Sequence, residues 1–153
     1  FIDPDTGKIL TDRPVIEDKG TVSSWLTDGG DWVYGMHAYR ANLFAYSLQE
    51  RRIVRSLPEM DLGDNCSNCL IFGPDGRIWG LTVQCLFAAE RDLSRFEKVA
   101  DYEDHAGLNG NRYGLCTGSD GHVYFPNGLH LARISPVGTG PQHCQTKSAS
   151  HLA

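Results

Sequence analysis

The sequence predicts an all-β protein built from a repeated unit of four antiparallel strands. A turn motif recurs every 45 residues, from position 30 to 75 and from 75 to 120, at Gly30-Asp31, Asp75-Gly76 and Asp120-Gly121. A β-branched residue and an aromatic residue follow each motif, as Val33-Tyr34, Ile78-Trp79 and Val123-Tyr124. A large apolar residue stands five positions before each motif, as Trp25, Leu70 and Leu115. A period of this length is typical of the four-stranded blades of a β-propeller.

The second repeat shows how each period divides into strands. We predict strands near 69–72, 77–83, 85–89 and 96–100, with Gly73-Pro74-Asp75-Gly76 as the first turn because proline presets one φ and glycine accepts a positive one. The segment 88–102 also fits a helix, since Leu93, Phe96 and Val99 recur at a spacing of three. The equivalent segments 1–15 and 44–57 favour a strand, a turn and a second strand instead.

The chain length predicts an incomplete ring. A chain of 153 residues holds about 3.4 blades of this period, whereas propellers close with roughly four to eight. We expect a partial β-propeller over 1–134 and a loop or disordered tail over 135–153. The expected blades cover about 1–20 (partial), 21–60, 66–105 and 111–134 (partial). The partner that completes the ring is expected to be the remaining blades of a larger chain or a second copy of this one.

Composition and charge narrow the classes of partner. The formal net charge of −5 and the lack of a clustered basic patch argue against a nucleic-acid surface. No apolar run is long enough to span a membrane, so no membrane partner is expected either. The five cysteines leave the compartment open between the cytoplasm and export. Cys69 and Cys116 fall on equivalent faces of neighbouring inner strands, where a disulfide bridge or two buried thiols are both possible.

One segment carries a resemblance to known proteins. The residues from Leu70 to Gly80, Leu-Ile-Phe-Gly-Pro-Asp-Gly-Arg-Ile-Trp-Gly, resemble the blade motif shared by the virginiamycin B lyase group, the NHL repeats and the SMP-30 or gluconolactonase-like group. The resemblance extends over roughly 1–134 at the level of the repeat. It implies a β-propeller. Because the matching residues are turn and core positions, it carries over no catalytic residue.

The architecture predicts where a ligand would bind. Propeller ligands usually bind at the tunnel mouth, which is formed by the loops that lead from one blade to the next. These loops are expected at 14–23, 57–68 and 102–112, and they are rich in carboxylates and amides. Such groups could hold a divalent cation such as calcium or magnesium, or they could serve only turn hydrogen bonds and solubility. The candidate metal ligands are Glu17, Asp61, Asp64, Asn65, Glu103 and Asn109.

Two further features could carry chemistry. In Asp104-His105 the carboxylate could orient the imidazole for acid or base catalysis, although a loop histidine can equally be a surface residue. The aromatic residues Tyr34, Trp79 and Tyr124 could form a platform for a sugar, but packing between neighbouring sheets explains a repeated aromatic position more simply.

Two functions of different classes follow as hypotheses. The first is a binding platform that presents its tunnel-mouth loops to a protein or glycan ligand. The second is a metal-assisted lyase or lactone hydrolase in which carboxylates and amides hold a divalent cation and His105 moves a proton. The fold alone does not choose between them.

Overall fold

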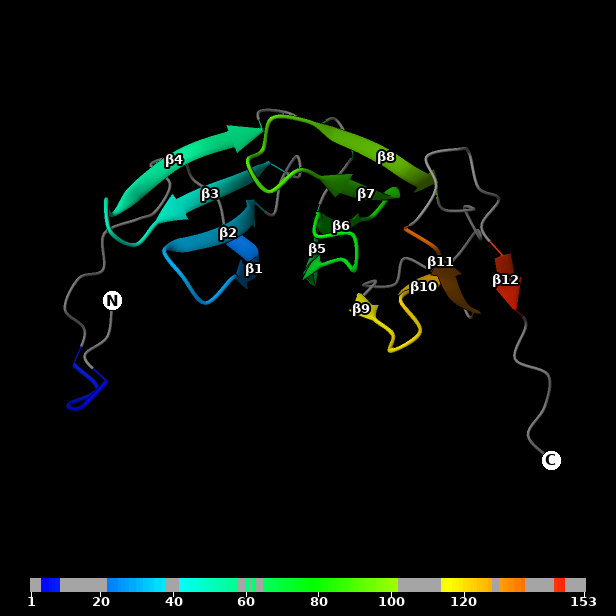
Figure 1. Ribbon diagram of the computed structural model, residues 1–153, viewed down its shortest axis with the longest axis horizontal. Coiled ribbons are helices and arrows are strands. Elements are labelled where there is room, and N and C mark those ends of the chain that lie inside the picture. Colours follow the sequence, from blue (N-terminus) through cyan, green and yellow to red (C-terminus); the bar gives the residue numbers. More distant parts are fainter. Residues whose placement is uncertain are drawn as a thin grey trace.

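The structure is a computed structural model that describes residues 4–8, 22–37, 42–57, 60, 62, 65–101, 114–127, 130–136 and 145–147. Within these residues the protein is all-β, with three antiparallel sheets of four strands each (Figure 1). The described part of the chain contains no helix that could cross a membrane.

Each sheet is a meander in which strands that follow one another in sequence are paired. The first sheet contains β1 (Val22–Thr27), β2 (Trp32–His37), β3 (Leu43–Ser47) and β4 (Arg52–Leu57). The second contains β5 (Asn65–Phe72), β6 (Ile78–Thr82), β7 (Cys85–Ala89) and β8 (Phe96–Asp101). The third contains β9 (Cys116–Thr117), β10 (Val123–Asn127), β11 (His130–Ile134) and β12 (Gln145–Lys147).

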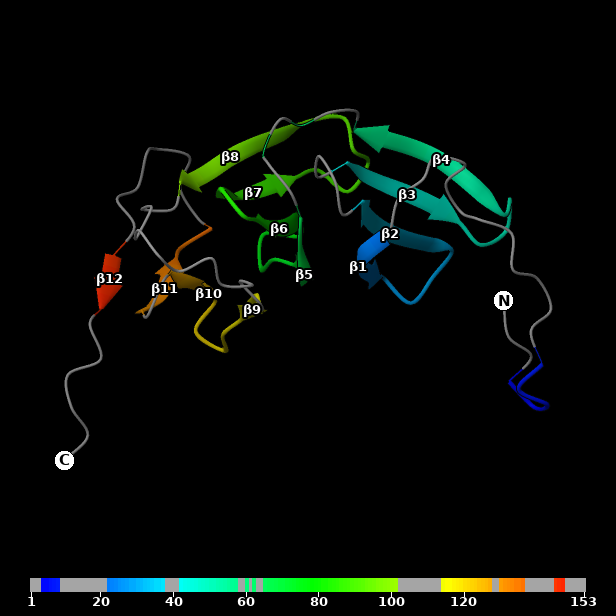
Figure 2. The same cartoon turned by 180° about the vertical axis from the view of Figure 1, so that it is seen from behind.

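The three sheets lie side by side along an open arc, as both views of the ribbon show (Figures 1 and 2). The first strand of each sheet lies on the concave side, where β1 contacts β5 and β5 contacts β9. The strands β4 and β8 lie on the convex side. This arrangement is that of successive propeller blades, and the ring that they begin is not closed.

Hydrogen bonds between inner strands keep the 45-residue period in register. The N–H of Cys69 in β5 donates to Ser24 Oγ in β1 over 3.2 Å. The hydroxyl of Thr117 in β9 donates to the carbonyl of Phe72 in β5 over 3.3 Å. Both bonds join residues 45 positions apart, so each links a residue to its own equivalent in the next blade.

The four-stranded blade predicted for the second repeat is confirmed. A turn over 90–95 separates β7 from β8, so the helical alternative across 88–102 is wrong. The equivalent segment 44–57 also folds as strand, turn and strand. Within the segment 135–153, expected to be a loop or disordered tail, the structure has the short strand β12, which pairs with β11.

Two hydrophobic cores fill the spaces between neighbouring sheets. The first combines β2 and β3 with one side of β6 and β7, and its buried members include Tyr34, Met36, Leu43, Ile78 and Phe87. The second combines the other side of β6 and β7 with the third sheet, and its buried members include Trp79, Leu81, Leu86, Val123 and Phe125. The middle sheet is therefore covered on both faces, which explains why β6 and β7 are buried at every position.

The aromatic and cysteine positions can be compared with expectation. Tyr34 and Trp79 are buried in the two cores, which confirms the packing interpretation for them. Tyr124 is only half-buried, and no sheet within the described residues covers it. Cys69 is buried as expected. Cys116 is exposed, so the expected burial of its thiol is wrong, and both residues of the short strand β9 are exposed.

Candidate functional site

The two ends of the strands present different groups. At one end lie the turns that join the second strand of a sheet to the third, together with the connections between sheets. This is the tunnel-mouth end at which the sequence predicts a ligand site. At the other end lie the turns from first to second strand and from third to fourth.

At the tunnel-mouth end, Thr82 anchors the connection between the first and second sheets. Its hydroxyl donates to the carbonyl of Leu62 over 2.5 Å and accepts hydrogen bonds from the N–H groups of Gln84 and Cys85 at 3.2 and 3.1 Å. Thr82 is fully buried, and Met60 and Leu62 are buried in the first core. Leu62 is thus attached to the turn between β6 and β7, and that turn presents the exposed residues Val83 and Gln84.

The residues expected to bind a cation fall mostly outside the described part of the chain. These are Glu17, Asp61, Asp64, Glu103 and Asn109. The backbone of Asn65 begins β5 and pairs with Thr82, which places this residue at the tunnel-mouth end, but its side chain also lies outside the description. The described residues form no cluster of three or more His, Cys, Asp or Glu side chains suited to a metal ion. The acid–base pair Asp104 and His105 lies outside the described residues as well.

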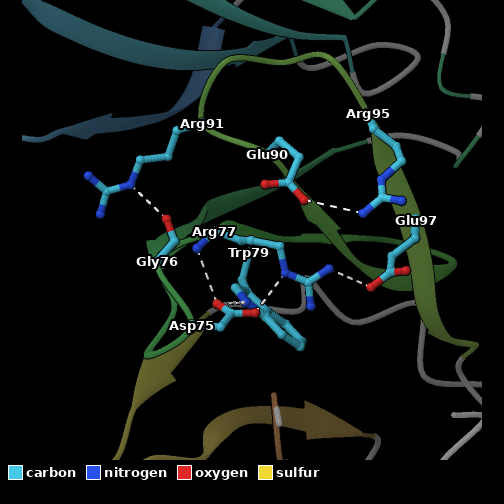
Figure 3. A network of polar contacts seen from close by, with 8 residues as sticks. All are labelled: Asp75, Gly76, Arg77, Trp79, Glu90, Arg91, Arg95 and Glu97. Carbon is cyan, nitrogen blue, oxygen red and sulfur yellow. Dashed lines mark hydrogen bonds and ion pairs between the residues drawn. The ribbon is translucent and has the colours of Figure 1, made fainter. Parts of the chain in front are cut away.

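At the opposite end, Asp75 organises the first turn of the second sheet (Figure 3). Its Oδ1 accepts hydrogen bonds from Trp79 Nε1 at 2.9 Å and from the N–H of Arg77 at 3.1 Å, while Arg77 Nε donates to Oδ2 over 2.7 Å. Burial raises the pKa of Asp75, but the hydrogen bonds from Trp79 and Arg77 outweigh it and hold the pKa below its ordinary value.

Further charged side chains lie close to this turn, at the same end of the second sheet. Arg77 Nη1 donates to Glu97 Oε1 in β8 over 2.5 Å, as Figure 3 shows. Arg91 donates to the carbonyl of Gly76 over 2.7 Å, and its guanidinium lies 4.1 Å from the centre of the Phe72 ring. A surface hollow of about 570 Å³ is bordered by Asp75, Gly76, Arg77, Glu90, Arg91, Asp92, Ser94 and Arg95.

The third sheet repeats the carboxylate arrangement. Asp120 Oδ2 accepts a hydrogen bond from the Tyr124 hydroxyl at 2.6 Å, and Oδ1 accepts one from the N–H of His122 at 3.2 Å. Asp75 and Trp79 occupy the equivalent positions one blade earlier. An aspartate four residues before the repeated aromatic was a visible signal of this contact, and sequence reasoning missed it. Because the same contact closes both turns, we assign these carboxylates to the fold and not to chemistry.

The first turn of the first sheet has different contacts, because Gly30 stands at the position equivalent to Asp75. There Asp31 Oδ2 accepts a hydrogen bond from Ser47 Oγ at 2.7 Å, and Oδ1 accepts one from the N–H of Gln49 at 2.6 Å. The aspartate thereby joins the first turn of the sheet to its third turn. This difference supports a structural role for the carboxylates at this end.

Comparisons with known proteins agree with the geometry. No family model matches the chain, and no curated protein matches it. Among solved structures, the extracellular domain of the one component system BT4673 from B. thetaiotaomicron is 20% identical, with a TM-score of 0.63. That match covers 92% of this chain and 18% of the other.

Virginiamycin B lyase from Staphylococcus aureus is also similar, at 16% identity and a TM-score of 0.58, over 82% of this chain and 40% of the lyase. A catalytically inactive variant of that lyase, solved with quinupristin, matches at 16% identity over 83% of this chain and 41% of the variant, with a TM-score of 0.59. These similarities show the β-propeller fold and confirm at that level the resemblance indicated by the sequence. The chain spans less than half the length of each of these proteins.

Proposed function

We propose that this β-propeller module is a binding platform for a protein or glycan ligand, which it contacts through its tunnel-mouth loops at 14–23, 57–68 and 102–112. The observation that carries the proposal is the hydrogen bond from the buried Thr82 hydroxyl to the carbonyl of Leu62. A residue that buried contacts already hold in place loses less conformational entropy when a ligand binds beside it. The exposed pair Val83 and Gln84 lies beside this attachment and would form part of the contact surface.

The proposal includes a divalent cation held by the same loops. Carboxylate and amide oxygens are the ligands that calcium prefers, and it accepts them in flexible geometry. Glu17, Asp61, Asp64, Asn65, Glu103 and Asn109 come from successive blade connections, which is where a tunnel-mouth cation would collect its ligands. Such a cation would neutralise part of the acidic charge of these loops and could bind the hydroxyl groups of a glycan.

The alternative function is that of a metal-assisted lyase or lactone hydrolase. The observation that favours it is the structural similarity to virginiamycin B lyase over 82% of the chain. In this alternative His105 moves a proton, Asp104 orients its imidazole, and a bound cation polarises an oxygen of the substrate.

The platform is tested by screening the chain on a glycan array with and without calcium. A hit is then measured with the double variant V83D/Q84A and with the control variant R95A, which changes an exposed side chain at the opposite end. We expect the double variant to lose at least tenfold in affinity and the control to retain it. Equal affinity in all three proteins would place the contact elsewhere and contradict the proposal.

The alternative is tested by incubating the chain with quinupristin and with a sugar lactone, each with and without magnesium. Turnover that is lost in His105→Ala would favour the enzyme and replace the platform. Turnover that survives in His105→Ala would remove the proposed proton carrier.

A further inference from the structure

Tyr34 differs from its equivalents in the other two sheets in what its polar group contacts. Those equivalents, Trp79 and Tyr124, each donate a hydrogen bond to a turn aspartate, over 2.9 and 2.6 Å respectively. In the first sheet Gly30 stands at the position of that aspartate. Tyr34 is only 3% exposed, and its hydroxyl makes no hydrogen bond to any residue that the structure describes. The first sheet therefore has the aromatic donor of the repeat without the carboxylate that accepts from it.

The two carboxylates in the first turn of this sheet have other partners. Asp28 Oδ1 accepts a hydrogen bond from a backbone N–H of the same turn at 2.8 Å. Both oxygens of Asp31 accept hydrogen bonds from the third turn of the sheet, at 2.7 and 2.6 Å. A buried hydroxyl without an acceptor is unfavourable, because it has given up its hydrogen bonds to water. The Tyr34 hydroxyl is thus available to an acceptor that comes from outside this sheet.

Arg91 brings a second donor close to Tyr34 from the second sheet. Its guanidinium lies 4.1 Å from the centre of the Phe72 ring, and the Tyr34 ring packs perpendicular to that ring with centres 5.8 Å apart. Arg91 Nε donates to the carbonyl of Gly76 over 2.7 Å, as Figure 3 shows. Its two terminal nitrogens form neither a hydrogen bond nor an ion pair within the described part of the chain. Two such parallel N–H groups match the two oxygens of a carboxylate.

The charges around Tyr34 keep its hydroxyl a donor and leave Arg91 for a ligand. Burial and the Asp28 carboxylate raise the pKa of this hydroxyl, and the charges of Arg91 and Arg55 offset them only in part, so the group is protonated at neutral pH. Arg55 lies 3.9 Å from the carboxylate of Asp92 and compensates its charge. Arg91 is exposed and borders the surface hollow at this end of the second sheet, which gives a ligand access to its guanidinium.

We infer that the Tyr34 hydroxyl and the Arg91 guanidinium together bind a carboxylate group of a ligand. In the second sheet an aromatic N–H and an arginine bind the Asp75 carboxylate in the same way. In the first sheet the ligand supplies this carboxylate. Because its contacts with the Phe72 ring and a backbone carbonyl already hold Arg91 in place, the side chain loses little entropy on binding. The site lies at the end opposite the tunnel mouth, so the inference does not depend on the proposed ligand platform.

The experiment is an NMR titration of the isotope-labelled whole chain with sodium acetate and, at equal ionic strength, with sodium chloride. Acetate is expected to shift the Nε–H resonance of Arg91 in a saturable way, whereas chloride is not. The Nε–H resonance of Arg52 is the internal control and should not move, because this side chain is exposed and pairs with Glu50 in the first sheet. A wild type in which acetate causes no saturable shift at Arg91 would overturn the inference.

Two variants then separate the two donors, with the backbone N–H of Asp92 as the reporter. Tyr34→Phe removes only the hydroxyl, and Arg91→Lys keeps the charge but loses the paired N–H groups. Each is expected to weaken acetate binding about tenfold, as the loss of a hydrogen bond to a charged group does. The matched controls Tyr46→Phe and Arg52→Lys should bind acetate like the wild type. A dispersed spectrum shows that each variant is folded. Wild-type affinity in Tyr34→Phe or in Arg91→Lys would contradict the two-donor site.

Discussion

Gly80 in β6 lies directly opposite Phe87 in β7, and the phenyl ring fills the space that a side chain at Gly80 would need. A Cβ at position 80 would clash with Phe87 Cζ. The first sheet has the same arrangement, with Phe44 over Gly35. Each glycine therefore allows a phenyl ring to lie flat against the neighbouring strand.

The third sheet reverses this pair. Phe125 in β10 occupies the position equivalent to Gly80, and it faces Ala132 in β11, which occupies the position equivalent to Phe87. Both residues are buried. One phenyl ring and one small residue thus fill the same space in all three sheets, and the ring can come from either strand.

This relationship predicts that the pair can be exchanged in the second sheet. Phe87→Ala should cost about 3–5 kcal/mol of unfolding free energy because it leaves a cavity. Gly80→Phe should also be destabilising because two rings compete for one space. The double variant G80F/F87A should lie within about 2 kcal/mol of the wild type, since it conserves the volume. Urea denaturation of the four proteins measures this, and simple additivity of the two single effects would contradict it.

The hydrogen bonds of Asp75 predict a specific pH dependence of stability. Burial disfavours the carboxylate, but Trp79 and Arg77 donate to it and keep the pKa in the folded state below the unfolded value of about 3.9. A lowered pKa stabilises the folded state fully above the unfolded value, and this contribution is lost as the pH falls through the folded value. Asp75→Asn should therefore cost about 1–2 kcal/mol at pH 7 and progressively less below about pH 4.

The control for Asp75 is Trp79→Phe, which removes one donor and keeps the carboxylate. Its pKa in the folded state should move back toward the ordinary value, so the acid-sensitive part of the stability should shrink without vanishing. Urea midpoints between pH 7 and pH 3 give both comparisons. A difference between the wild type and D75N that is constant over this range would refute the role assigned to the carboxylate.

The hydrogen bonds of Thr82 predict that its hydroxyl group keeps the turn at Gln84 and Cys85 ordered. Thr82→Val keeps the shape but removes the donor to Leu62 and the acceptor for Gln84 and Cys85. We expect a loss of about 1–3 kcal/mol because buried groups lose their partners. Amide hydrogen exchange at Gln84 and Cys85 should accelerate in T82V and return toward the wild-type rate in T82S. Unchanged exchange in T82V would show that the hydroxyl does not hold the turn.

Truncation to alanine is expected to cost more stability at Arg91 than at Arg95. Arg91 lies 4.1 Å from the centre of the Phe72 ring and donates to Gly76, so Arg91→Ala should cost about 1 kcal/mol. The side chain of Arg95 is 74% exposed and its closest approach to Glu90 is 3.4 Å, so Arg95→Ala should change stability by less than about 0.5 kcal/mol. Thermal unfolding of the two variants tests the contrast, and equal losses would count against it.

Much of the blade could be predicted because its signals are local. The turn at Gly73-Pro74-Asp75-Gly76 lies where the sequence places it, between β5 and β6. The burial of Tyr34 and Trp79 also followed from their place in the repeat. The attachment of Thr82 to Leu62 could not be predicted in this way, since it joins groups 20 positions apart whose approach depends on how two sheets pack.

The candidate tunnel-mouth ligands stay predictions, as do Asp104 and His105. The sequence indicates only the blade connection on which each residue lies. Binding would require oxygens from at least two connections to converge on one point, and the period of a repeat does not specify the conformation of such a connection. The described residues at this end establish the anchored turn beside which these groups would have to meet.

Leu86 and Leu131 show which property of a residue the sequence determines and which depends on the tertiary structure. The sequence alone determined that both are leucines at the same position of a four-stranded blade, because alternation and turn chemistry act over a few neighbouring residues. Only the tertiary structure decided that Leu86 is fully buried and Leu131 is largely exposed. The physical reason is that the burial of a blade surface depends on the sheet beside it, and Leu86 is covered by the third sheet while no described sheet covers Leu131.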